Sequence, residues 1–199
     1  GAFTNCQKLL NINIPNGVTY IGQQTFMSSG LTTITLPNSL TTVNAETFSG
    51  CSSLETVKLS SSITSIHPGA FALCTKLNNI DTSENSNFIF EDNCLYTKDY
   101  KKLLAATGNI TSIRVNEVTE EIESKSINNN NIKEIYIPAS VIKIGEENAL
   151  GGYILDKLVV DEKNQYYASY DNDLYDKNFE ILYKCNKEGN IKVRDGVKK

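Results

Sequence analysis

The sequence predicts a β-rich solenoid, in which the chain winds through a stack of similar coils. Two observations support this prediction: one pattern recurs along most of the 199 residues, and each copy contains short runs of alternating apolar and polar residues. A unit this short cannot enclose its own core, so its apolar residues must be buried against the same positions of its neighbours. Frequent Thr, Ile and Val also favour strands.

The first strand of each coil is centred on an apolar residue. The spacings between successive centres are 22, 23, 23, 33, 22, 23 and 33 residues. Pro15, Pro37 and Pro138 follow this strand in three coils, where a missing N–H ends ladder pairing. We therefore expect a ladder of parallel strands on one face. Its centres are Ile12, Ile34, Val57, Ile80, Ile113, Ile135, Leu158 and Ile191.

The remainder of each coil follows a fixed order. In "LPNSLTTVNAETFSGCSSL", apolar Leu40 and Val43 indicate a second short strand, and Phe48 and Cys51 follow it. We expect the segment around Phe48 to be a short helical or 3-10 step that returns the chain to the next coil.

Two longer coils interrupt the short ones. "EDNCLYTKDYKKLL" from Glu91 matches "YDNDLYDKNFEILY" from Tyr170, and Asp-Asn suits a tight hairpin turn. We interpret both as β-hairpin insertions that project from the solenoid. The chain is then one domain, 1–199, with short coils at 1–76 and 110–154 and long coils at 77–109 and 155–190. Both ends fall within a repeat, as expected for an excerpt of a longer protein.

Composition excludes two classes of partner. The net charge is −4, and no run of Lys and Arg could follow a phosphate backbone, so we expect no nucleic-acid binding. No apolar stretch is long enough to span a bilayer, so we expect no membrane insertion by this segment.

The sequence predicts no catalytic, cofactor or metal site. Cys6, Cys51 and Cys74 each follow a Phe by three residues and share one phase of the coil. A small buried space-filling side chain explains them best, although a Cys51–Cys74 disulfide and a metal remain alternatives. Neither C-x-x-C nor clustered His is present, and His67 is the only histidine.

The outward residues of the first strands form the candidate binding face. Strand alternation points the residues beside each centre to solvent, and seven coils spaced by about 4.8 Å would form a row roughly 35 Å long. Alternatively, such a row is a plain consequence of a solenoid, and its Thr residues reflect only strand propensity. The tyrosines near Tyr170 are a second candidate. The candidate binding residues are Thr33, Thr35, Thr56, Lys58, Asp81, Arg114, Glu134, Tyr136 and Lys157.

The repeat resembles a known family. "LTTITLPNSLTTVNAETFSGC" and "LETVKLSSSITSIHPGAFALC" resemble the BspA-type leucine-rich repeats of bacterial surface and secreted proteins, and the resemblance covers nearly the whole chain. In the long coils, Asn93 and Asn172 replace the glycine usual in that family's hairpin repeat.

The resemblance implies a leucine-rich-repeat solenoid at the cell surface or secreted. It further implies a non-enzymatic protein-binding module without cofactors, used for adhesion to proteins of a host cell surface, extracellular matrix or neighbouring cell, or to a glycan. A spacer that displays another domain of a longer protein is the alternative.

Overall fold

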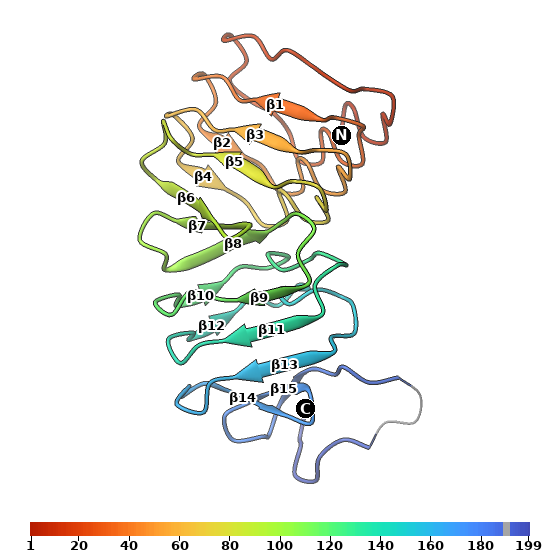
Figure 1. Cartoon of the computed structure of the whole chain (residues 1–199), viewed down its shortest axis with the longest axis vertical. Helices are drawn as coiled ribbons and strands as arrows, with labels where there is room; N and C mark the ends of the chain where they lie inside the picture. The colour runs from red at the N-terminus through yellow and green to blue at the C-terminus, as the bar shows by residue number, and fades with distance from the viewer. Residues whose placement is uncertain (189–191) are drawn as a thin grey trace.

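The computed structural model describes residues 1–188 and 192–199, which form a stack of coils built from short strands (Figure 1). Ile191, predicted as the last strand centre, lies outside the described residues. The strands are β1 (Thr33–Thr35), β2 (Thr42–Val43), β3 (Thr56–Lys58), β4 (Ser65–Ile66), β5 (Asn79–Asp81), β6 (Phe88–Glu91), β7 (Cys94–Thr97), β8 (Lys102–Ala106), β9 (Ser112–Arg114), β10 (Glu121–Ile122), β11 (Glu134–Ile137), β12 (Lys143–Ile144), β13 (Lys157–Val160), β14 (Tyr167–Tyr170), β15 (Asp173–Asp176) and β16 (Leu182–Lys184).

Parallel strands stack on two walls of the solenoid. On the first wall, β1, β3 and β5 form one ladder and β9, β11 and β13 form another. On the second wall, β2 pairs with β4, and β10 pairs with β8 on one side and with β12 on the other. The strand register places equivalent residues of successive coils side by side, for example Ile34, Val57 and Ile80. All three are buried, so each coil completes the core of its neighbour.

The expected helical or 3-10 steps are turns in the structure, and the described residues contain no helix. In the turn around Phe48, Glu46 and Gly50 have positive φ values of 55° and 71°, which interrupt any right-handed helix. The amides of Phe48 and Gly50 donate to Ala70 O and Ala72 O of the next coil, at 2.9 and 2.8 Å. Backbone amides that a helix would keep within one coil therefore join two coils.

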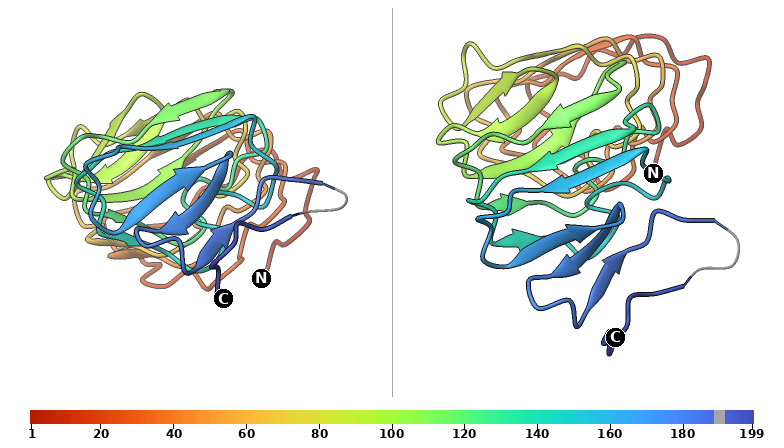
Figure 2. Two further views of the ribbon diagram at one scale, coloured as in Figure 1. Left: turned by 90° about the horizontal axis from the view of Figure 1, so that it is seen from below. Right: turned by 60° about the horizontal axis from the view of Figure 1, so that its bottom comes forward.

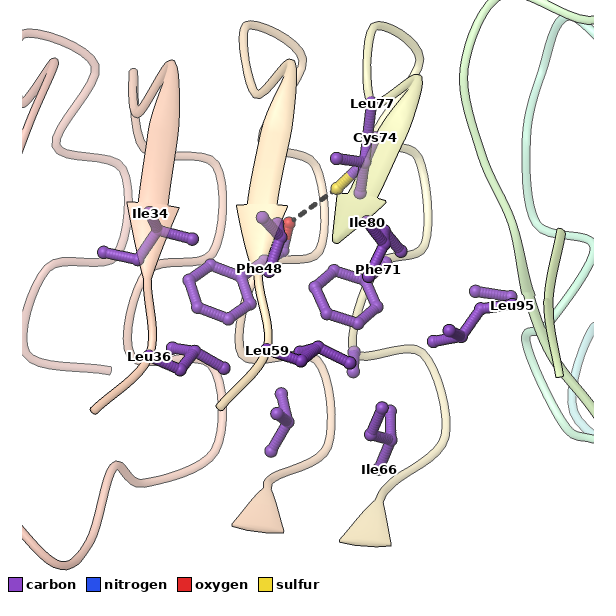
Figure 3. Close-up of a cluster of buried hydrophobic side chains, with 14 of the residues drawn as sticks. Ile34, Leu36, Phe48, Leu59, Ile66, Phe71, Cys74, Leu77, Ile80 and Leu95 are labelled. Carbon is purple, nitrogen blue, oxygen red and sulfur yellow. Dashed lines mark hydrogen bonds between the residues drawn. The ribbon is translucent and has the colours of Figure 1, made fainter. Parts of the chain in front are cut away.

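A column of phenylalanine rings lies behind these turns, and its members Phe26, Phe48 and Phe71 are buried in the core. Phe3, Phe26, Phe48 and Phe71 stack with ring centroids 5.4 to 5.6 Å apart and nearly parallel planes. Beside the column, the free thiol of Cys74 donates to Phe48 O at 3.1 Å (Figure 3). Cys51 is also free and bonds Phe26 O in the same way, which agrees with the structural role expected of these cysteines.

The first hairpin does not project from the solenoid, contrary to our expectation. Strands β6, β7 and β8 form an antiparallel sheet, named here the transverse sheet, whose β7 and β8 are buried almost throughout. Leu95 of β7 packs into the core that contains Phe71 (Figure 3). Its neighbours Cys94 and Tyr96 pack into the following core, around Ile113. The transverse sheet therefore crosses the interior and separates two hydrophobic cores.

The reason lies in the sequence of the hairpin. Cys94, Leu95 and Tyr96 are consecutive apolar residues, and residues 103–106 are also consecutively apolar. A strand whose two faces are both apolar is stable only when both faces are buried. A projecting hairpin would expose at least one of these faces to water.

The second hairpin repeats this arrangement at the end of the stack. Strands β14, β15 and β16 are antiparallel, and Leu174 of β15 packs into the second core. Viewed along the stack, these strands lie across the outline of the coils (Figure 2). Asp173 and Tyr175, on either side of Leu174, are 1% exposed. This hairpin also lies against the solenoid body rather than projecting from it.

Contacts across the transverse sheet join the coils before and after it. The Leu73 amide donates to Asn128 O at 2.7 Å. The Lys125 ammonium lies 2.6 Å from the Glu46 carboxylate, and this hydrogen bond is the main reason that the pKa of Glu46 is lowered.

No helix within the described residues could cross a membrane.

We predict that Leu95→Ala lowers the free energy of unfolding by about 2–5 kcal/mol, because it leaves a cavity in a filled core. Chemical denaturation followed by circular dichroism measures the change. Leu10→Ala, at a residue that is 55% exposed, is the control and should cost about 0.5 kcal/mol or less. Equal small losses for the two variants would contradict the burial of the transverse sheet.

Candidate functional site

The candidate binding face is divided in two. We expected one row of seven strands, but β1, β3 and β5 form one ladder and β9, β11 and β13 another, with no pairing between β5 and β9 among the described strands. The residues around Ile12 are not assigned as a strand. Thr33, Thr35, Thr56, Lys58 and Asp81 therefore lie on the first ladder, and Arg114, Glu134, Tyr136 and Lys157 lie on the second.

The first ladder presents small side chains and locally paired charges. Thr33 and Thr35 are exposed, and Lys58 forms an ion pair with Glu84 at 2.7 Å. Asp81 accepts hydrogen bonds from the hydroxyl and amide of Ser83, which lower its pKa. Lys58 and Asp81, the two charged candidates on the first ladder, thus have partners within the chain and offer little to a binding partner.

The second ladder holds a cation stacked on an aromatic ring. Register places Arg114 beside Tyr136 on adjacent strands, and the guanidinium carbon lies 3.6 Å from the ring centroid. Such a cation–π contact contributes about 0.5–1 kcal/mol at an exposed site. The Arg114 side chain is 62% exposed, and its ion pair with Glu117 is long, at 3.5 Å. Arg114 is therefore held in place while much of its surface remains open to a partner.

Asp161 anchors the other end of this pair. The Tyr136 hydroxyl donates to Asp161 Oδ2 at 2.6 Å. This hydrogen bond is the main reason that the pKa of Tyr136 is raised and the pKa of Asp161 is lowered. The Lys163 amide also donates to Asp161, at 2.8 Å. Arg114, Tyr136 and Asp161, named here the Tyr136 triad, span three adjacent coils.

A shallow hollow lies beside the Tyr136 triad. It has a volume of about 320 Å³, and its lining includes Ser112, Glu134, Lys157 and Val159. Glu134 and Lys157 are neighbours in register and exposed. Neither forms an ion pair with a described residue. The hollow thus offers a carboxylate and two cationic side chains, Lys157 and Arg114, next to the ring of Tyr136.

Asp161 is not among the binding residues predicted from the sequence, although strand alternation points to it. Strand alternation places Lys157 and Val159 outward, and two residues further along the same alternation reaches Asp161. The sequence predicts a turn at this repeat position, because Pro37 and Pro138 occupy it in other coils.

The structure adds no support for the other candidate sites, namely His67, a metal site and the tyrosines near the second hairpin. His67 is exposed in a loop segment. Within residues 1–188 and 192–199, no group of three His, Cys, Asp or Glu side chains is placed to hold a metal ion. Among the tyrosines near the second hairpin, Tyr175 is buried, whereas Tyr166, Tyr170 and Tyr183 are about half exposed.

The stacked coils, parallel ladders and inward apolar columns define a leucine-rich-repeat solenoid. The model of the BspA type leucine rich repeat region matches residues 1–105 and 95–154, with six copies. The chain therefore belongs to the BspA-type leucine-rich repeat family. No curated protein matches the chain.

Solved structures of three bacterial proteins are similar to the chain. A leucine-rich repeat protein from Eubacterium ventriosum has 23% identity and a TM-score of 0.47, over 85% of this chain and 43% of that one. A leucine rich cell surface protein from Faecalibacterium prausnitzii has 20% identity and a TM-score of 0.46, over 79% and 56%. The pneumococcal vaccine antigen PcpA has 19% identity and a TM-score of 0.40, over 71% and 54%. The chain spans about half the length of these proteins.

We predict that Tyr136→Phe raises the pKa of Asp161 toward its ordinary value, because the carboxylate loses the hydroxyl that favours its charged form. An NMR titration of the side-chain carboxyl carbon measures this pKa. Tyr166→Phe, at an exposed tyrosine, is the control and should leave it unchanged. An unaltered Asp161 titration in Tyr136→Phe would show that the hydrogen bond is absent in solution.

Proposed function

We propose that this chain is a non-enzymatic protein-binding module that contacts its partner through the second ladder. The observation that carries the proposal is the Tyr136 triad, an exposed arginine and a tyrosine already held in one arrangement on adjacent coils. Tyr and Arg are enriched among the residues that dominate binding energy at protein interfaces. The first ladder has neither residue on its outward positions.

Preorganisation strengthens this proposal. Binding costs free energy when flexible side chains become ordered, by about 0.5–1.5 kcal/mol for each immobilised long side chain. Arg114 stacks on Tyr136, and Asp161 fixes the Tyr136 hydroxyl, so much of this ordering has occurred before a partner arrives. The nearby Glu134 and Lys157 supply charges of both signs that select orientation more than affinity.

The proposed setting is the surface of a cell or the secreted fraction, with adhesion to host or neighbouring-cell proteins as the role. Membership of the BspA-type family supports this setting. The strand face, with its shallow hollow beside the Tyr136 triad, suits a protein surface better than a small substrate. A spacer role, in which the solenoid only displays another domain, is the competing outcome of the test below.

We predict that Tyr136→Ala and Arg114→Ala each weaken capture of a protein partner by at least about 30-fold, the effect of losing roughly 2 kcal/mol at an interface anchor. The immobilised chain is exposed to host cell-surface and matrix proteins, and the affinity for the captured protein is then measured by surface plasmon resonance. Circular dichroism checks that each variant is folded.

Two controls keep the outcomes distinct. Tyr166→Ala removes an exposed tyrosine away from the second ladder, and Thr33→Ala removes a side chain from the first ladder. Both should bind as the unaltered chain does. A partner whose affinity is unchanged by Tyr136→Ala and Arg114→Ala would overturn the proposed site, and the absence of any saturable partner would favour the spacer.

A further inference from the structure

A cavity beside the second hairpin lies apart from the residues of the binding face. It has a volume of about 290 Å³ and is bordered by β12, the turn that follows it, β14 and β16. This volume is at the lower end of ligand pockets, so it suits a ligand with a single ring. Its lining includes Glu146, Asn148, Gly151, Tyr167, Tyr183 and Lys184.

Lys184 supplies this cavity with a partly buried cation that has no counter-ion among the residues that the structure describes. Its ammonium group donates to Gly151 O at 2.9 Å and to Tyr153 O at 3.0 Å. An ammonium group has three N–H donors, so one remains. Within the described residues, no carboxylate lies within ion-pair distance of Lys184. Its side chain is only partly exposed, and partial burial of a cation without a counter-ion costs free energy.

Two other partly covered lysines of this chain, Lys125 and Lys187, have carboxylate partners. Lys125 lies 2.6 Å from Glu46, and Lys187 lies 2.7 Å from Asp171. These hydrogen bonds raise the pKa of both lysines, whereas loss of hydration lowers the pKa of Lys184. The position of Lys184 therefore favours an anion brought from outside the chain.

The walls of the cavity select the group that carries the anion. Tyr183 is 54% exposed, and its ring packs edge-on against Tyr167 at 5.6 Å, which holds an aromatic face at the cavity. Asn148 and Glu146 are exposed and supply amide and carboxylate groups for hydroxyl partners. An aromatic face, several polar groups and one free cation suit a hydroxylated ring that bears a carboxylate.

We propose that this cavity binds a carboxylate-bearing monosaccharide unit, a uronic acid or a sugar acid of similar size. The carboxylate pairs with Lys184, the ring lies against Tyr183, and the hydroxyl groups reach Asn148 and Glu146. The proposal is independent of protein binding at the second ladder, because no residue of the Tyr136 triad lines this cavity.

NMR titration of the amide signals of the whole chain with glucuronate, glucose and acetate tests the proposal. Glucuronate should produce saturable shifts at Gly151, Tyr183 and Lys184, with glucose and acetate at least tenfold weaker. Lys184→Met should weaken glucuronate at least tenfold, whereas Lys163→Met, at an exposed lysine away from the cavity, should leave it unchanged.

Each other result counts against the proposal. Equal binding of glucose would remove the role of Lys184, and equal binding of acetate would remove the role of the sugar ring. Absence of saturable shifts in the folded chain would overturn the site altogether. If Lys184→Met fails to fold, Tyr183→Ser at the exposed ring takes its place, and unchanged glucuronate affinity in that variant would also overturn the proposal.

Discussion

Hydrogen bonding between coils is the constraint on which the rest of the structure depends. A coil of this length has too few residues to bury its own apolar side chains, so it gains a core only by matching the coil on either side. The turn around Phe48 also depends on the neighbouring coil, because the amides of Phe48 and Gly50 donate to carbonyl groups of the next coil rather than of their own turn. The positive φ of Glu46 and Gly50 and the column of phenylalanine rings follow from the same requirement.

The transverse sheet interrupts the hydrophobic core but maintains backbone pairing along the second wall. It separates two cores, and each face of β7 completes one of them. The sheet that begins with β12 and β10 on the second wall continues through β8 into the interior, so backbone pairing is maintained there. On the first wall, pairing stops at β5 and starts again at β9. The interruption leaves two strand ladders of different chemistry, and the exposed Arg114, stacked on Tyr136, lies on the second ladder alone.

Much of the fold follows from the sequence because the repeat reports burial directly. The apolar centres Ile34, Val57 and Ile80 were predicted to share one column, and they do. The outward positions followed from strand alternation in the same way. The position of the hairpin did not follow, because an Asp-Asn turn identifies a hairpin without saying where it packs. The run Cys94–Leu95–Tyr96 contained that information. The link from Tyr136 to Asp161 joins different coils, so spacing within one coil could not reveal it.

Residue-resolved hydrogen–deuterium exchange most directly tests the claim that the transverse sheet is buried between two cores, since it reports how well each amide is protected from exchange with solvent. The structure predicts that amides of β7 and β8 exchange as slowly as those of β3 and β11, because opening the transverse sheet would expose two cores together. Fast exchange throughout β7 and β8, at the rate of the exposed segment around Asn16 and Gly17, would contradict the account and return the hairpin to the solenoid surface.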